Sequence, residues 1–119
     1  MSIEVDVLLF EIAGRVYGTD VTQVSRISRS GSVKPIDSIL GTPDNGQKAL
    51  IFNAGHTGER ALSVDVVRGV RRMSSEQLRR LPVAAAAPRI FAGAWLDGDA
   101  TVLLVDMSQM VQFAERKNA

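Results

Sequence analysis

Short apolar runs rich in β-branched residues recur along the whole chain, and most of them stop at glycine or at Asp or Asn. Runs of this kind predict β-strands. They lie at residues 5–12, 15–17, 49–52, 60–73, 90–96 and 100–105. Because these runs do not alternate with long helical patterns, a parallel α/β sheet is excluded. The pattern predicts a mainly β protein whose strands form one or two small barrels.

Local signals place two turns and a kink between these runs. An Ala-Gly pair ending at Gly14 joins the first two runs as a hairpin, because glycine tolerates the positive φ of a tight turn. An Asp-Gly pair ending at Gly98 joins the last two runs in the same way. Gly69 is expected to kink the long run 60–73. Successive strands therefore pair antiparallel at both ends of the chain.

Helical structure is expected to be short. Asp20 is expected to cap a helical turn that contains Val21 and Val24. An extension to Ile27 stays open, and the β-branched content argues against a long helix there. Ser74, with Gln77 three residues later, has the spacing of a capping box and predicts a short helix that ends by the next proline. Ser108 is expected to cap a C-terminal helix.

Two stretches are expected to be loops. Residues 28–47 are rich in serine, glycine and proline, and only Val33 and Ile36 are expected to form a short extended piece there. The alanines of residues 83–87 lie between two prolines, and this context favours a connecting loop over a helix.

Composition excludes several classes of protein and of site. At 119 residues, with 45% hydrophobic and 23% charged residues, the chain has the make-up of a globular domain. It has no cysteine and one histidine, which excludes disulfides, a thiol nucleophile and a multi-histidine zinc site. No apolar run approaches the ~20 residues of a membrane span. We therefore expect a soluble, cytoplasmic protein without direct membrane insertion.

Positive charge is concentrated in one segment. The net charge is only +1, yet residues 60–89 contain seven arginines against two carboxylates, which is +5 and leaves −4 for the rest of the chain. One interpretation is a solvated strand face followed by a solvated helix face. The other is a docking surface for an acidic partner, with Arg68, Arg71 and Arg72 as its candidates.

The sequence indicates no set of catalytic residues. His56 lies in a polar turn, and the sequence suggests neither a nucleophile nor an orienting partner for it. Asp65 and Asp106 each follow an apolar strand, and two such carboxylates without a third ligand are more often turn or cap groups than metal ligands. No glycine-rich phosphate loop is present. The sequence therefore predicts no enzyme activity, no cofactor and no metal.

The order of segments carries a resemblance to a known family. The matching parts are the opening hairpin (7–12 and 17–21), the step Ile39-Leu40-Gly41, the central hairpin ending in Val64-Asp65-Val66-Val67 with Val70, the capped turn before Pro82, and the last hairpin (90–93 and 102–106). In order and spacing they resemble the CheW-like domain of bacterial chemotaxis coupling proteins. The resemblance spans nearly the whole chain and implies a single CheW-like domain over residues 1–119.

The chain departs from the family after Gly41. There the family usually continues with an "N-L-R-G" loop and a strand ending in "V-D-L", whereas this chain has Thr42–Gln47 and then the strand 49–52. About twenty residues are missing at usual element lengths. The first barrel is therefore expected to lack a strand, and residues 28–47 are expected to cover the sheet edge that this loss exposes.

The resemblance implies two SH3-like barrels related by a pseudo-two-fold axis, and a non-enzymatic adaptor that binds chemoreceptor tips. Family positions that contact the receptor fall on Val24, Gly41, Val67 and Val70. For Val24, a groove position and a core position remain equally open. Because the arginine loop is missing, binding to a CheA-type histidine kinase is expected to be weak or lost.

A second interpretation remains open: a small β-barrel that binds nucleic acid through the basic segment Arg60–Arg89. The near-zero net charge opposes it, and so do the few aromatic side chains, which make up only 5% of the chain.

Overall fold

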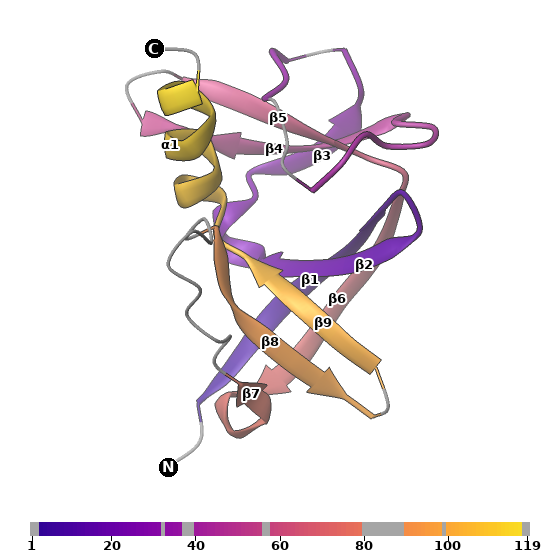
Figure 1. The fold of residues 1–119 in the computed structure, drawn as a ribbon, viewed down its shortest axis with the longest axis vertical. Helices are drawn as coiled ribbons and strands as arrows, with labels where there is room; N and C mark the ends of the chain where they lie inside the picture. Colours follow the sequence, from indigo (N-terminus) through magenta and orange to yellow (C-terminus); the bar gives the residue numbers. More distant parts are fainter. Residues whose placement is uncertain are drawn as a thin grey trace.

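The computed structural model describes residues 3–31, 33–36, 40–55, 58–79, 90–98 and 100–117. Most of these residues lie in strands, so the mainly β prediction is confirmed (Figure 1). The strands are β1 (Glu4–Ile12), β2 (Arg15–Asp20), β3 (Arg26–Arg29), β4 (Lys48–Asn53), β5 (Glu59–Val64), β6 (Val66–Ser74), β7 (Leu78–Arg79), β8 (Phe91–Asp97) and β9 (Ala100–Val105). The helices are the 3₁₀ turns η1 (Val21–Gln23) and η3 (Ser75–Gln77), and α1 (Met107–Lys117).

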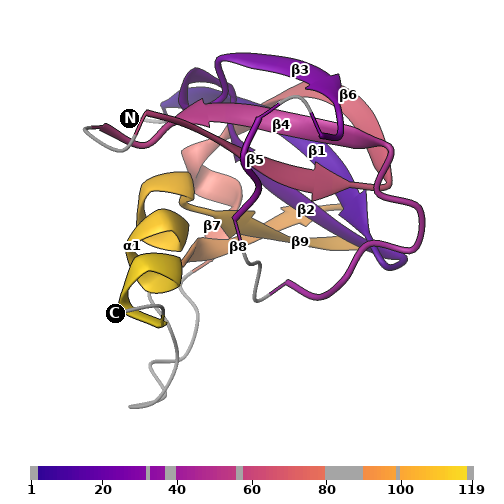
Figure 2. The ribbon, with the colours of Figure 1, turned by 90° about the horizontal axis from the view of Figure 1, so that it is seen from above.

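The strands form two sheets. The large sheet has the order β6-β1-β2-β9-β8-β7, and the small sheet has the order β3-β4-β5. Only Asp65 separates β5 from β6, so one stretch of chain passes from the small sheet into the large one. Figure 1 shows the small sheet and α1 at one end of the long axis and β7 and β8 toward the other; Figure 2 views the molecule from the small-sheet end.

β1 is buried on both of its faces. Leu8 and Phe10 belong to the larger core cluster, which also takes side chains from the small sheet and from α1. Val7 and Leu9 belong to a second cluster that lies within the large sheet. A strand covered on both faces needs no polar alternation, which explains the unbroken apolar run of this segment.

The helical turn predicted after Asp20 is a short one. The helical turn after Asp20 ends at Gln23, and Ile27 lies in β3, where it pairs with Leu50 of β4. β-branched side chains fit this pairing better than a further helical turn. The Asp20 cap itself is confirmed, since its side chain accepts a hydrogen bond from the Thr22 N–H at 2.9 Å.

The long run 60–73 is two strands rather than one. The break lies at Asp65. The predicted kink at Gly69 is also present, because the register of β1 against β6 shifts between Leu9 and Phe10, next to Gly69 at φ 103°. The hairpin turns at Gly14 and Gly98 are confirmed, with positive φ at both residues.

Of the two later helices, the first agrees with its prediction and the second begins at another residue. The capping box of Ser74 and Gln77 is confirmed, and η3 stops at Gln77, before the proline, because Leu78 pairs with Trp95 in β7. α1 begins at Met107 and its cap is Asp106, not Ser108. The predicted loop at 83–87 lies outside the described residues.

The loop predicted at 28–47 begins later than expected but does cover a sheet edge. Residues 28 and 29 belong to β3. Beyond them, Ile36 N–H donates to the carbonyl of Ala61 at 2.9 Å, and Ala61 N–H donates to the carbonyl of Lys34 at 3.0 Å. Residues 34–36 therefore bond to the outer side of β5, as the sequence predicted for the edge of the first subdomain.

Candidate functional site

Two of the four candidate receptor positions pack against the larger core cluster. Val24 follows η1 in extended conformation, is half-buried, and packs against that cluster, as does the half-buried Val67 of β6. Val70, three residues further along β6, is 52% exposed. The structure thus brings Val24 and Val67 to the same cluster from distant parts of the chain, and leaves Val70 on the surface of the strand that carries Val67.

Gly41 offers room for a partner to approach. It is exposed and has φ 107°, and a Cβ added there would meet no atom within 4 Å. The preceding residue, Leu40, is buried in the larger cluster and anchors this point of the loop. A side chain at position 41 would therefore meet backbone strain rather than a steric clash.

A polar network fixes the position of η1, and no sequence signal pointed to it. Thr19 is fully buried, and its hydroxyl donates to the carbonyl of Val105 at 2.9 Å. The side-chain oxygen of Gln23 accepts from the Met107 N–H at 3.0 Å, and its amide donates to Asp106 at 3.3 Å. These bonds join η1 to the start of α1, which determines where Val24 emerges.

Asp65 binds two loops through its carboxylate. Oδ2 accepts from the N–H groups of Ala13 at 2.8 Å and of Asp44 at 3.0 Å, while Oδ1 accepts from those of Asn45 and Gly46. The hydrogen bonds from Asn45 and then Ala13 hold the pKa of Asp65 well below its usual range. Burial opposes them, and the hydrogen bonds from Gly46 and Asp44 lower the pKa further. Asp65 thus binds turns, as the sequence favoured, rather than serving as a metal ligand.

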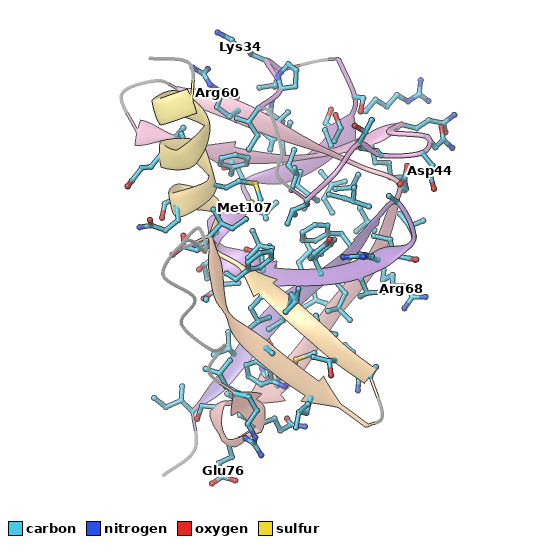
Figure 3. All side chains as sticks on the ribbon, in the orientation of Figure 1. Lys34, Asp44, Arg60, Arg68, Glu76 and Met107 are labelled. Carbon is cyan, nitrogen blue, oxygen red and sulfur yellow. The ribbon has the colours of Figure 1, made fainter. Side chains whose placement is uncertain are left out.

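The arginines of β6 lie beside carboxylates of β1. Arg68 Nε donates to Glu11 at 2.9 Å, and Arg72 Nε donates to Asp6 at 3.3 Å. Arg72 also lies 3.6 Å from Glu4. Figure 3 shows Arg68 and Asp44 on the side of the molecule away from α1. Two of the seven arginines of the basic segment are therefore paired with carboxylates of the neighbouring strand.

The described part of the chain contains no group of three or more His, Asp or Glu side chains placed to hold a metal ion. His56, the only histidine, lies outside the described residues. No helix among the described residues is long and apolar enough to cross a membrane.

Comparisons with known proteins give one relative and one fold. A scan against models of known families finds no match. The chain is 40% identical over 102 residues to the Frizzy aggregation protein FrzB of Myxococcus xanthus, and the aligned region covers 86% of this chain and 90% of that protein. Its fold is similar to that of the scaffolding protein TtCheW from Thermoanaerobacter tengcongensis, with a TM-score of 0.65 and 15% identity over 88% of this chain and 86% of that one.

Proposed function

This chain belongs to the CheW-like family of chemotaxis coupling proteins, and we propose that it works as a non-enzymatic adaptor that binds the tips of methyl-accepting chemoreceptors. A scaffold role in chemosensory signalling goes with the family. The more specific part of the proposal is the contact with the receptor, which we expect at Val24, Gly41, Val67 and Val70.

One observation carries the receptor contact: Val70 is 52% exposed on the same strand as Val67, which packs on the larger core cluster together with Val24. An amphipathic helix binds by laying its apolar face against such a surface. Gly41 supports the proposal, because the space around its Cα lets a partner approach the backbone closely. The contact would therefore combine residues of β6, the end of η1 and the loop after Leu40.

We further propose that kinase coupling is weak or lost. In this chain the residues after Gly41 make a short loop, and three of its backbone N–H groups, at residues 44–46, are bound to Asp65. This short loop takes the place of the family's arginine loop. Without the arginine loop, the first subdomain lacks part of the surface that the family offers to the kinase.

The receptor contact is tested by a charge placed on Val70. A Val70→Asp variant should bind a receptor-tip fragment at least about tenfold more weakly, because the carboxylate is desolvated in the contact. Leu96→Asp is the matched control, since Leu96 is 38% exposed on β8. Equal losses in the two variants, or no loss in Val70→Asp, would contradict the proposal.

The kinase part is tested separately, by titrating the cognate kinase's regulatory domain. A full-length coupling protein from the same cell is the reference. The proposal expects much weaker binding by this chain than by the reference. Equal affinity would refute the loss of kinase coupling while leaving the receptor contact intact.

The nucleic-acid alternative has little support in the structure. Arg68 and Arg72, at the centre of the basic segment, are paired with carboxylates of β1. These carboxylates weaken the positive potential that would attract a phosphate backbone, and the net charge of the chain is only +1. We do not propose nucleic-acid binding.

A further inference from the structure

β6 is a long edge strand. It has nine residues, against the usual five or six, and among the described residues it pairs on one side only, with β1. Ser75 N–H donates to the carbonyl of Ile3 at 2.7 Å, so the residue just after β6 faces β1. Because backbone groups alternate in direction along an antiparallel strand, the N–H and C=O groups of Val70 and Arg72 point away from β1, along the open edge.

A groove of about 530 Å³ lies between this edge and the β8–β9 hairpin. Arg68 and Arg71 of β6 line one side, and Ala100 and Thr101 of β9 line the other. Leu9 and Val102 also line it, and they belong to the second core cluster. The open edge therefore adjoins a hollow with an apolar floor.

The charge of β6 argues against a second copy of this chain as the occupant. β6 carries three arginines and no carboxylate. Two β6 edges paired with each other would bring six guanidinium groups together, and like charges opposite one another in a sheet are destabilising. Arginine on an edge strand protects against this kind of self-pairing.

The same arginines can bind an acidic strand. The side chains of Arg68 and Arg72 are 52% and 68% exposed, and exposed ion pairs such as theirs with β1 are weak. A guanidinium has five N–H donors, so each can hold a second carboxylate while keeping its present one.

We propose that an extended acidic segment of a partner protein adds to the open edge of β6 as a further strand. Its backbone bonds to the outward groups of Val70 and Arg72. Side chains on one face of the added strand enter the groove and are apolar, while those on the other face are acidic and reach the exposed guanidinium group of Arg72. Main-chain bonding supplies affinity, and the alternation supplies selectivity.

The probe is a nine-residue, dye-labelled peptide of alternating valine and glutamate, followed by fluorescence anisotropy. Wild-type protein should bind it, and the charge-reversal variant Arg72→Glu, which repels the acidic face of the peptide, should bind at least about tenfold more weakly. Arg60→Glu is the matched control, because Arg60 belongs to the same basic segment but lies on β5. Trp95, the single tryptophan, packs in the cluster that contains Leu9 and Val102, so its fluorescence should change on binding.

Residue-resolved amide exchange tests the strand itself. The amides of Val70 and Arg72 should exchange fast in the free protein and become protected by the peptide, whereas that of Arg71, which faces β1, is protected throughout. A valine–lysine peptide, or the acidic peptide methylated on the backbone nitrogens that face β6, should not bind. Equal binding of either peptide, binding without new protection, or protection by raised protein concentration alone would overturn the proposal.

Discussion

The small and the large sheet protect their edges by different means. On β5, residues 34–36 bond to Ala61 and cover the backbone there, and the opposite edge, β3, is only four residues long. On the large sheet, β7 has two residues, but β6 has nine, and among the described residues its own arginines are what protects it. An edge covered by backbone is closed to every strand, whereas an edge protected by charge excludes its own copy and still admits a strand of opposite charge.

The first prediction asks whether the two sheets unfold together. Phe52 is 1% exposed, lies on β4 and packs in the cluster that also holds Leu8 and Phe10 of the large sheet. Phe52→Ala should lower the free energy of unfolding by about 3–5 kcal/mol. Urea transitions followed by Trp95 fluorescence, which reports on the large sheet, and by circular dichroism should still coincide. Separate transitions would mean that the sheets are independent units.

The second prediction tests the cover on β5. Ile36→Pro removes the N–H that donates to Ala61 and should lower the free energy of unfolding by about 1–3 kcal/mol more than Ile36→Ala, which keeps that donor. Both variants lose the Ile36 side chain from the larger cluster, so their difference in urea unfolding isolates the backbone bond. The proline variant should also self-associate more in sedimentation, because the β5 edge is then open. Identical behaviour of the two variants would show that residues 34–36 do not protect this edge.

The third prediction concerns Asp65, at the junction of the sheets. Its pKa is lowered in the folded state, so its stabilising effect is complete above the unfolded-state pKa of roughly 4 and is lost as the pH falls below that value. Asp65→Asn should therefore reduce the melting temperature at pH 7 and flatten the dependence of stability on pH below 4. Asp44→Asn is the control, because Asp44 takes part through its backbone N–H. If stability falls with pH below 4 as steeply in Asp65→Asn as in the wild type, Asp65 is not the group responsible.

The smallest effect on stability is expected at β6. Arg72→Ala removes exposed ion pairs with Asp6 and Glu4 and should change the free energy of unfolding by about 0–1 kcal/mol. Replacing Arg68, Arg71 and Arg72 together with threonine should have a different consequence, because the triple variant has a long uncharged edge strand. That triple variant should self-associate in sedimentation velocity at concentrations where the wild type does not. A triple variant that associates no more than wild type would show that charge is not what protects β6.

Local features were predictable because their causes lie within a few residues. The turns at Gly14 and Gly98 and the capping box of Ser74 and Gln77 depend on backbone conformations and side-chain bonds of adjacent residues. The cap of α1 was predicted two positions too late, because Asp106 and Ser108 are both good cap residues. The end of β9 at Val105 decides that Asp106 is the cap. The sequence left Ile27 open between a helical turn and another structure, because the valines before it have helical spacing and only pairing with β4 selects the strand.

The amino-acid sequence by itself determined the mainly β class, the two terminal hairpins, the family and the need for residues 28–47 to cover an edge. Tertiary structure alone decided that Asp65 binds two loops, that Gln23 joins η1 to α1, and that β1 carboxylates pair with β6 arginines. It also decided that β6, among the described residues, pairs with β1 alone. The physical reason is range: turns and caps follow from neighbours in sequence, whereas these bonds join residues roughly 20 to 85 positions apart, and their partners are chosen only when the sheets pack.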